Sequence, residues 1–352
     1  TVKDSGKSYS FNNNDGVKAK NKPKKENNTK GSSNKPNKQN IVDIKETSTN
    51  DGQTVKSDKI FINTDTVIID PNDNISNPVW GIWDLKSYTI PESSFTLKGY
   101  SVAALRTNFY IPELEVMLDA GLSAPNFKTS HIFITHGHSD HCANLPFHIY
   151  GSNVANNTVK IHVPEESYTF LNNFIIYGYC MSSHPDESIP VEDLYLHKYY
   201  TMLKSKSGDI FDLDHKTKSI SVEVIQCHHS VPCLGYGFIE KRKKLKEEFK
   251  ALKGKEIAEL RKSGVDLNYD QEYYHFVFLG DTSKKIFAEE KIKKYKNIMI
   301  ECTFLYEEDY EQADKTCHIH WKDLHDYVKE NSQNNFILYH FSQRYRKKEI
   351  LE

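Results

Sequence analysis

Between residues 136 and 141 the chain reads His136-Gly137-His138-Ser139-Asp140-His141, directly after the apolar run at 131–135. An apolar run of this kind is typical of a buried strand, so the three histidines and the aspartate fall at the end of that strand. Imidazole and carboxylate groups are good ligands for Zn²⁺ and similar divalent ions. A solvated polar loop is the alternative interpretation. Because the spacing lets one short loop face two ions, we expect His136 and His138 to point to one ion, and Asp140 and His141 to its neighbour.

Three more candidate ligands lie far along the chain, each at the end of a short apolar run. His229 follows residues 222–225, Asp281 follows 275–279, and His340 follows 336–339. A lone histidine is usually a structural side chain, and the Gly-Asp-Thr at 280–282 taken alone is usually a turn. Strand ends converge on one site in a layered sheet protein, however. The matching contexts therefore predict that all these side chains share a site.

The composition restricts the class of protein. The chain has 352 residues, of which 38% are apolar, so it can build a sizeable core in one large domain or two small ones. Its net charge of −2 gives no overall basic field of the kind that indicates a nucleic-acid partner. No apolar run of about 20 residues is present in the sequence, so we expect no transmembrane helix and no membrane partner.

The cysteines do not suggest a disulfide framework, because no two of them form a Cys-x-x-Cys pair. The six are Cys142, Cys180, Cys227, Cys233, Cys302 and Cys317. Reduced thiols in an intracellular protein, cytoplasmic or nuclear, are the simplest interpretation. The sequence starts at Thr1 rather than Met, which leaves targeting to an organelle open.

Two regions of different character are expected, a disordered tail at 1–55 and a folded domain at 56–352. The tail is dominated by Asn, Lys, Ser, Thr and Gly, and it buries too little apolar surface to offset its ordering entropy. In the folded part, strand patterns at 87–90, 100–103, 115–119, 160–163 and 219–224 are interspersed with helix patterns at 144–150, 167–177, 284–294 and 321–329. This arrangement favours sheets whose outer faces are covered by helices.

Residues 240–272 are a charged insertion that we expect to be helical. The segment from Lys241 to Lys246 holds four Lys, one Arg and no acidic residue. One interpretation is a solvated surface helix with ion pairs between residues i and i+4. The other, which the basic cluster favours, is a mobile arm over the site that holds a polyanion.

The loop at 136–141 resembles the signature of the metallo-β-lactamase superfamily. Flanking segments narrow the resemblance to ribonuclease Z, the tRNA 3′-processing endonuclease: His-Ser-Val-Pro-Cys-Leu-Gly-Tyr at 229–236, Glu-Cys-Thr-Phe at 301–304, Cys-His at 317–318 before Trp-Lys-Asp-Leu, and His-Phe-Ser-Gln-Arg-Tyr at 340–345. The similarity covers about residues 98–347. It implies an α+β fold, a four-layer αββα sandwich with a metal site at one edge of the packed sheets.

The same resemblance implies a set of metal ligands. One ion would be bound by three histidines, His136, His138 and His229. The other would be bound by Asp140, His141 and His340, and Asp281 would bridge the two ions. His228 competes with His229, whose spacing to Pro232 and Gly235 is the better match. Two Zn²⁺ ions per chain are expected, with Mn²⁺ or Fe²⁺ as alternatives.

Catalytic roles follow from the resemblance as well. Glu301 and His318 would form a dyad that protonates the departing ribose 3′-oxygen, and Asp140 would orient or deprotonate the attacking water. Ser342 and Arg344 would hold a phosphate near the scissile bond. Asp119, at the end of a strand, would orient a histidine.

The implied function is a metal-dependent phosphodiesterase that cuts RNA endonucleolytically. The substrate would be a tRNA precursor, cut at its 3′ trailer by a hydroxide that two metal ions activate. Relatives of this length are commonly homodimers, so a homodimer is expected as well.

Some positions depart from the family. Ile300 stands where the family has a histidine, and Cys317 where it has a glycine. The segment between His229 and Asp281 has only about 50 residues and lacks a clear Gly-Pro tip, whereas the family has a longer arm that grips the tRNA elbow. Lys253-Gly254-Lys255 is a candidate for a reduced version. These departures leave the hydrolytic centre intact but put tRNA specificity in question.

Other functions remain in competition. A glyoxalase II-type thioesterase shares the ligand set, including the bridging aspartate, and a promiscuous β-lactamase is a further hydrolase of the superfamily. The segments at 301–304 and 340–345 argue against the thioesterase. A non-enzymatic RNA-binding module with structural metals is the third alternative, which the complete ligand set disfavours.

Overall fold

The computed structural model describes residues 87–351, except 125–126, 151–157, 187, 191–193, 195 and 216. The expected tail at 1–55 and the expected start of the folded domain lie outside the described residues. Among the described residues, no helix is long and apolar enough to cross a membrane.

The first sheet has seven strands that follow one another in chain order. Its antiparallel half contains β1 (Tyr88–Thr89), β2 (Thr96–Val102), β3 (Arg106–Ile111) and β4 (Val116–Leu118). Its parallel half continues from β4 through β5 (His131–Phe133), β6 (Val159–Pro164) and β7 (Tyr200–Ser205). The candidate metal loop leaves the end of β5, a strand with neighbours on both sides.

The second sheet has six strands in the order β13-β12-β11-β10-β9-β8. These strands are β8 (Ile210–Asp212), β9 (Ser219–Cys227), β10 (Cys233–Leu245), β11 (Asn268–Phe278), β12 (Asn297–Glu301) and β13 (Asn335–Tyr339). Strands β8 to β11 pair antiparallel, whereas β11, β12 and β13 pair parallel. The candidate ligands His229, Asp281 and His340 follow β9, β11 and β13.

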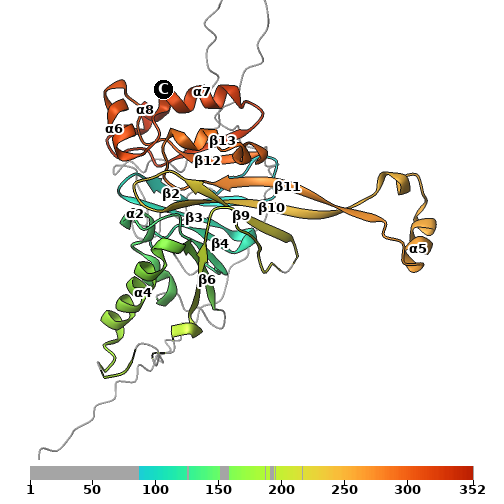
Figure 1. Ribbon diagram of the computed structural model, residues 1–352, viewed down its shortest axis with the longest axis horizontal. Coiled ribbons are helices and arrows are strands. Elements are labelled where there is room, and N and C mark those ends of the chain that lie inside the picture. Colours follow the sequence, from blue (N-terminus) through green and yellow to red (C-terminus); the bar gives the residue numbers. More distant parts are fainter. Residues whose placement is uncertain are drawn as a thin grey trace, which may run out of the picture. The chain divides into compact units, whose positions relative to one another are not determined.

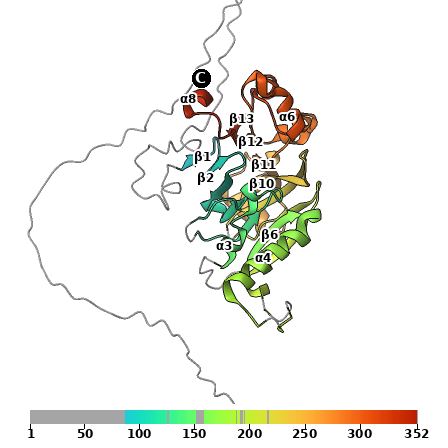
Figure 2. The same cartoon turned by 90° about the vertical axis from the view of Figure 1, so that its left-hand side faces the viewer.

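Three apolar clusters define four layers (Figures 1 and 2). The central cluster contains large side chains from both sheets, such as Phe109 and Phe133 from the first and Phe238 and Phe276 from the second. A second cluster joins the first sheet to α3 (Leu145–Tyr150) and α4 (Tyr168–Ser183). A third joins the second sheet to α7 (Trp321–Glu330) and α8 (Lys347–Leu351). The expected αββα sandwich is confirmed; the remaining helices are α2 (Ser139–Cys142), α5 (Gly254–Lys262) and α6 (Tyr310–Thr316).

The insertion at 240–272 is mainly a β-hairpin, so the expectation that it is helical is wrong for most of its length. Strands β10 and β11 pair from Tyr236↔Phe278 to Leu245↔Asn268, with one register shift between Phe238 and Ile239, and run out together from the sheet (Figure 1). The guanidinium of Arg242 lies 4.4 Å from the centre of the Tyr273 ring. Cross-strand contacts of this kind stabilise a strand against a helical alternative. Helical structure in the insertion is confined to its tip, where the 3₁₀ helix Glu247–Phe249 and α5 lie.

The segment 284–294 also differs from its expected helix. It forms two short 3₁₀ helices, Lys284–Ala288 and Glu290–Lys294, separated by the extended residue Glu289. Both Ile286 and Ile292 are fully buried in the third cluster. Residues six apart lie about 240° apart around an α-helix, so a straight helix could not bury both on one face. The break at Glu289 allows both side chains to reach the core.

Candidate metal centre

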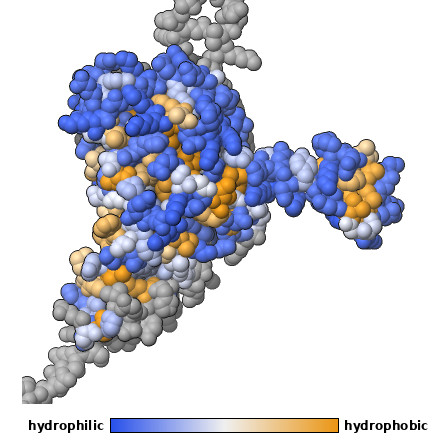
Figure 3. Space-filling model, viewed as in Figure 1, coloured by the Kyte–Doolittle hydropathy of each residue, from blue (hydrophilic) through white to orange (hydrophobic). Residues whose placement is uncertain are grey.

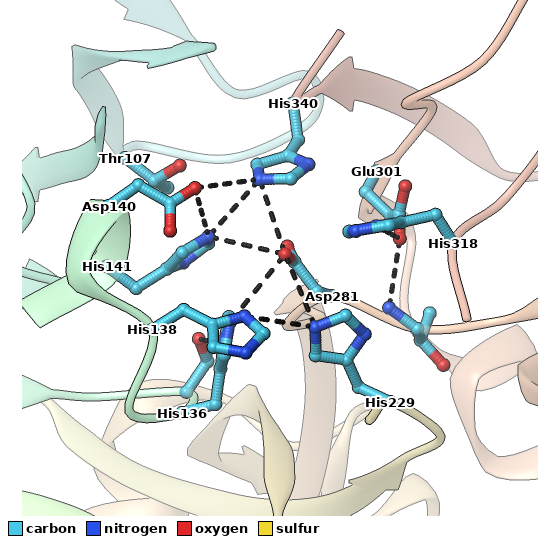
Figure 4. Close-up of polar contacts among 12 residues, drawn as sticks. Thr107, His136, His138, Asp140, His141, His229, Asp281, Glu301, His318 and His340 are labelled. Atoms are coloured by element: carbon cyan, nitrogen blue, oxygen red, sulfur yellow. Dashed lines mark hydrogen bonds and ion pairs between the residues drawn. The ribbon is translucent and has the colours of Figure 1, made fainter. Parts of the chain in front are cut away.

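The predicted ligands converge at one edge of the two sheets (Figure 4). They come from the loop after β5, which leads into α2, and from the segments that follow β9, β11 and β13. His229 belongs to the cluster, whereas His228 is exposed and lies outside it. The structure therefore brings together all seven residues that the sequence predicted as ligands.

The ligands form two groups that meet at Asp281. Each group offers atoms within 4.8 Å of one another; the groups are His136, His138, His229 and Asp281, and Asp140, His141 and His340. The Oδ2 atom of Asp281 lies 3.7 Å from His136 Nε2 and 4.0 Å from His229 Nε2. The same oxygen lies 3.4 Å from His141 Nε2 and 3.3 Å from His340 Nε2. Asp281 is thus the residue that faces both groups.

The outer nitrogens of two histidines face groups that can only accept a hydrogen bond. His141 Nδ1 donates to Asp119 Oδ2 at 2.8 Å, and His229 Nδ1 donates to the carbonyl oxygen of Cys317 at 3.1 Å. Since a neutral imidazole carries one N–H, the Nε2 atoms of both rings face the cluster as lone pairs. This arrangement orients a histidine as a metal ligand. The prediction that Asp119 orients a histidine is confirmed.

Two threonines hold the outer nitrogens of the other deeply buried histidines. Thr135 Oγ1 donates to Asp119 and lies 3.0 Å from His136 Nδ1, from which it can accept. Thr303 Oγ1 donates to Glu301 Oε2 at 2.6 Å and accepts from His340 Nδ1 at 2.9 Å. Each hydroxyl has one proton, which it gives to a carboxylate, so each ring donates to the hydroxyl. The Nε2 lone pairs of His136 and His340 then point inward too.

The inward-facing atoms are suited to a cation. Within the described part of the chain, His136 Nε2 and Asp281 Oδ1 are buried and have no hydrogen-bond partner. His141 Nε2 lies 3.3 Å from His340 Nε2, and His138 Nδ1 lies 3.2 Å from His229 Nε2. Buried polar atoms without partners are costly, and two facing lone pairs repel unless a proton or a metal ion lies between them. The donor set therefore fits divalent metal ions.

At His136 and Asp281, electrostatics favour the ionisation states that ligands need. Burial lowers the pKa of His136 well below its usual value, and the charge of His141 lowers it further. Burial alone would raise the pKa of Asp281, but His340, His141 and His136 outweigh it and hold that pKa well below its usual range. His136 is thus a neutral imidazole and Asp281 a carboxylate at neutral pH, as metal ligation requires. At His141, burial would lower the pKa, but Asp281 and Asp119 outweigh it and raise that pKa well above its usual value, so a metal ion would displace a proton there.

Glu301 and His318 form a buried pair beside the cluster. His318 Nδ1 lies 2.8 Å from Glu301 Oε1, and the backbone N–H groups of Thr282 and Thr303 donate to the two carboxylate oxygens. Burial would lower the pKa of His318, but the charge of Glu301 and its hydrogen bond outweigh that effect and raise it to about 9. His318 therefore holds a proton next to the cluster.

A cavity of about 470 Å³ opens onto these groups. Its walls include Asp140, Asp281, His318 and the two residues predicted to hold phosphate, Ser342 and Arg344. The side chain of Arg344 is 55% exposed, and its Nη1 atom is bound to Asp309 Oδ1 at 2.6 Å. The structure thus places Ser342, Arg344, His318 and Asp281 around one space.

Comparison with known proteins gives a consistent family. No family model matches the chain. The chloroplastic tRNase Z TRZ2 of Arabidopsis thaliana is 28% identical over 74% of this chain and 71% of its own length. The tRNase Z TRZ1 of the same plant is 26% identical over 73% of this chain and 88% of its own. The ribonuclease Z of Pyrococcus horikoshii is 28% identical over 64% of this chain and 73% of its own.

The chain is similar to ribonuclease Z. Two solved structures are similar to it at lower identity. Human tRNase Z, short form, is 16% identical with a TM-score of 0.42 and covers 70% of this chain and 93% of that chain. The metallo-beta-lactamase fold protein YhfI from Bacillus subtilis is 11% identical with a TM-score of 0.45 and covers 71% and 87%.

This ribonuclease Z-like chain has left-handed backbone at the site. Asp119, Cys317 and His340 have φ angles of 56°, 57° and 63°, a region that residues other than glycine rarely adopt. The left-handed backbone at Cys317 is one that glycine adopts most readily, which agrees with the glycine that the sequence resemblance implies at this position. Such outliers cluster at functional sites, where the surrounding structure holds them in place.

The sequence did not identify the roles of Thr135, Thr282 and Thr303. Thr303 lies in the Glu-Cys-Thr-Phe segment, which was noted for its resemblance alone. Its hydroxyl links the ligand His340 to the carboxylate of Glu301. A threonine beside a ligand or a catalytic acid is too common a neighbour to signal such a link without coordinates.

Proposed function

We propose that this protein is a metal-dependent phosphodiesterase that cuts RNA endonucleolytically, and that its substrate is a tRNA precursor, cut at its 3′ trailer. The observation that carries the proposal is the complete set of seven ligand-type residues next to the Glu301–His318 pair. One cavity is lined by members of both, namely His138, Asp140, Asp281, His340 and His318. The relatives it matches are named tRNase Z or ribonuclease Z.

We assign the ligands to two ions according to the two groups in which their atoms lie close together. His136, His138 and His229 would hold one ion, Asp140, His141 and His340 the other, and Asp281 would contact both. Bound divalent ions of this kind activate water near neutral pH and stabilise the charge of a phosphate under attack. Zn²⁺ suits a set of imidazole and carboxylate ligands, with Mn²⁺ and Fe²⁺ as alternatives.

The side chains divide the remaining work. The Asp140 carboxylate faces the cavity, where it would orient the attacking water and accept its proton. As the bond between phosphorus and the ribose 3′-oxygen breaks, His318 would give its proton to that oxygen. Glu301, which accepts from His318, would stabilise the ring in its charged form and hold it in place. The cut would leave a 3′-hydroxyl on one fragment and a 5′-phosphate on the other.

Ser342 and Arg344 would hold a non-bridging phosphate oxygen at the opposite wall of the cavity. Arginine binds phosphate through charge-assisted hydrogen bonds. In this structure one nitrogen of Arg344 is bound to Asp309. The side chain is more than half exposed, so its other N–H donors are open to a ligand. Arg344 can therefore reach an anion without leaving Asp309.

The β10–β11 arm is proposed to contact the RNA away from the cut. Its stem is hydrophilic, and an apolar patch lies at its tip around α5 (Figure 3). The stem carries the cluster from Lys241 to Lys246, in which Lys243 is paired with Asp270 and Lys246 with Asp266. Basic side chains along a projecting hairpin suit the backbone of a polyanion.

We propose that the protein acts as a homodimer inside the cell, in the cytoplasm or nucleus. All six cysteines are unpaired, in agreement with the expected reduced thiols. The relatives include a chloroplastic tRNase Z and a nuclear ribonuclease Z, so relatives are named for more than one compartment. Helix α4 offers a face for a second copy, because its 16 residues include no charged side chain and leave Phe170, Tyr177 and Met181 exposed.

The test is to incubate the zinc-loaded protein with a tRNA precursor that carries a 3′ trailer and to map the new ends. A single metal-dependent cut just after the discriminator base is expected, and it should vanish in Asp281→Asn. Scattered cuts, or none, would remove the tRNA assignment. Hydrolysis of a thioester but of no phosphodiester would instead support the glyoxalase II-type alternative.

A further inference from the structure

A second cavity adjoins the metal cluster at His229, and no role assigned above uses it. Its volume is about 400 Å³, and its lining includes His228, His229, Ser230, Ser283, Lys285 and Cys317. Because His229 also belongs to the ligand cluster, the cavity begins where the cluster ends. The His229 ring lies 4.8 Å from the ring of His318, which lines the first cavity. The two cavities thus adjoin the same catalytic groups.

Lys285 brings an unneutralised positive charge to this second cavity. Its side chain is exposed, and it has no ion pair within the part of the chain that the structure describes. Its neighbour Lys284 differs, since Lys284 Nζ lies 3.1 Å from Asp314 and 3.5 Å from Asp323. A free ammonium group at a cavity wall is available to an anionic ligand, whereas that of Lys284 is already paired with carboxylates.

His228 is fixed by its backbone and free at its ring. Its N–H donates to Thr282 Oγ1 at 2.9 Å, and its carbonyl accepts from the N–H of Ser283 at 2.8 Å. Its exposed imidazole has no hydrogen-bond partner among the described residues. The exposed hydroxyl of Ser230 lies two positions further along. An imidazole, a hydroxyl and an ammonium group therefore surround the cavity as unused hydrogen-bond donors.

We infer that this second cavity binds the RNA phosphate that adjoins the scissile one, with Lys285 supplying the charge and His228 and Ser230 hydrogen bonds. The inference rests on the proposed function, because an RNA chain cut at the metal cluster must carry its next phosphate against a neighbouring surface. The residues that line the second cavity include Lys285 and no carboxylate, so the cavity favours that path for an anionic group. His228 then has a role beside His229 without being a ligand.

The test uses Lys285→Ala in the full-length, metal-loaded protein with two substrates. For RNA we expect KM to rise about fivefold to tenfold with kcat unchanged. The slope of log(kcat/KM) against log[salt] should fall by about 0.7 in magnitude, the change expected when one phosphate contact to a single strand is lost. Hydrolysis of bis(p-nitrophenyl) phosphate, which has one phosphorus atom, should not change. Lys285→Arg should restore the native values. Lys291→Ala is the matched control, because Lys291 Nζ lies 3.6 Å from Glu223 and outside the cavity lining.

A methylphosphonate at each position flanking the cut identifies the phosphate. One such neutral linkage should weaken RNA cleavage by the native protein and have no further effect on Lys285→Ala. Three results would overturn the subsite. Lys285→Ala could affect RNA cleavage no more than Lys291→Ala does, or it could slow cleavage of both substrates equally. Its effect on RNA cleavage could also add fully to that of every neutral linkage. Failure of the native protein to cut any RNA would overturn the proposed function and this inference together, so the two failures are distinguishable.

Discussion

The imidazole of His141 is held from both sides at the centre of the site. Its Nδ1 atom is bound to Asp119, which also accepts from the N–H and hydroxyl of Thr135, while its Nε2 atom faces Asp281. Asp119 thus determines which nitrogen of His141 is free to bind metal. This is a residue-scale property, since it depends on one proton and one carboxylate.

Replacing Asp119 by Asn should weaken metal binding while nearly preserving side-chain volume. The amide cannot stabilise the ligand's N–H as a carboxylate does, so we expect metal affinity to fall about 10- to 100-fold. Competition with a chromophoric chelator measures the change. Glu240→Gln is the control, because it alters a buried carboxylate 2.8 Å from His275, away from the cluster. Native affinity in Asp119→Asn would refute the role.

His318→Ala separates proton donation from structural support. We expect RNA cleavage to slow about 10²- to 10⁴-fold, the usual contribution of a general acid. Hydrolysis of bis(p-nitrophenyl) phosphate should change little, because p-nitrophenolate leaves without a proton. His325→Ala, on the same side of the fold but paired only with Asp326, should leave both rates unchanged. Equal losses on the two substrates would contradict the assignment.

The sequence identified residues whose chemistry is distinctive and whose position at a strand end is regular. His136, His141, Asp281 and His340 are of this kind. The link from His340 through Thr303 to Glu301 could not be found in the same way, because a hydroxyl has no spacing rule and the contact spans 37 residues. The left-handed backbone of Cys317 was equally hidden, since cysteine carries no preference for it.

At the scale of elements, β10 and β11 show where local reasoning fails. Lys, Arg and Glu favour helices, and nothing within 240–250 argues against one. The partner strand lies more than twenty residues ahead, with Lys243 opposite Asp270 and Arg242 beside Tyr273. Pairing between distant segments overrides propensity here. Helices such as α7, whose apolar stripe is complete within its own sequence, were predicted close to their bounds.

Shortening the arm tests its proposed contact with RNA. Because Leu245 and Asn268 are direct partners, residues 246–267 can be replaced by an Asn-Gly turn that suits a two-residue hairpin. We expect KM for a tRNA precursor to rise about tenfold or more through lost phosphate contacts, with hydrolysis of bis(p-nitrophenyl) phosphate unchanged. Gel-shift and steady-state kinetics measure both. Native KM in the shortened protein would show that the tip at 246–267 does not bind RNA, and would confine any contact to the stem.

At the scale of the whole molecule, the uncharged face of α4 predicts self-association. Phe170, Phe174, Tyr177 and Met181 follow helical spacing and are 77%, 38%, 65% and 71% exposed. Together they offer on the order of 500 Å² of apolar surface, most of the roughly 800 Å² that each partner of a standard interface buries. We expect a dimer in sedimentation equilibrium and a monomer for Phe170→Glu with Met181→Glu. Ile210→Glu, at an exposed position of β8, is the control. A native monomer would refute the dimer.

The sandwich itself could be predicted because its periodic strands, its helices and its signature loop agree with one another. Which strand ends meet was a different matter. The strand-end positions of His136, His229, Asp281 and His340 predicted a shared site, and the resemblance placed that site at one edge of the packed sheets. The structure supplies the physical reason, since Tyr236 donates to the Ile134 carbonyl and Leu234 to that of Thr135, so the two sheets are joined beside the metal loop.

The central claim is that the cluster is a two-metal centre, and diffraction at the zinc absorption edge from zinc-loaded crystals tests it most directly. We predict two anomalous peaks per chain. One should lie about 2.0–2.2 Å from ligand atoms of His136, His138, His229 and Asp281, and the other at the same range from Asp140, His141, His340 and Asp281. A single peak, or peaks away from these residues, would contradict the account.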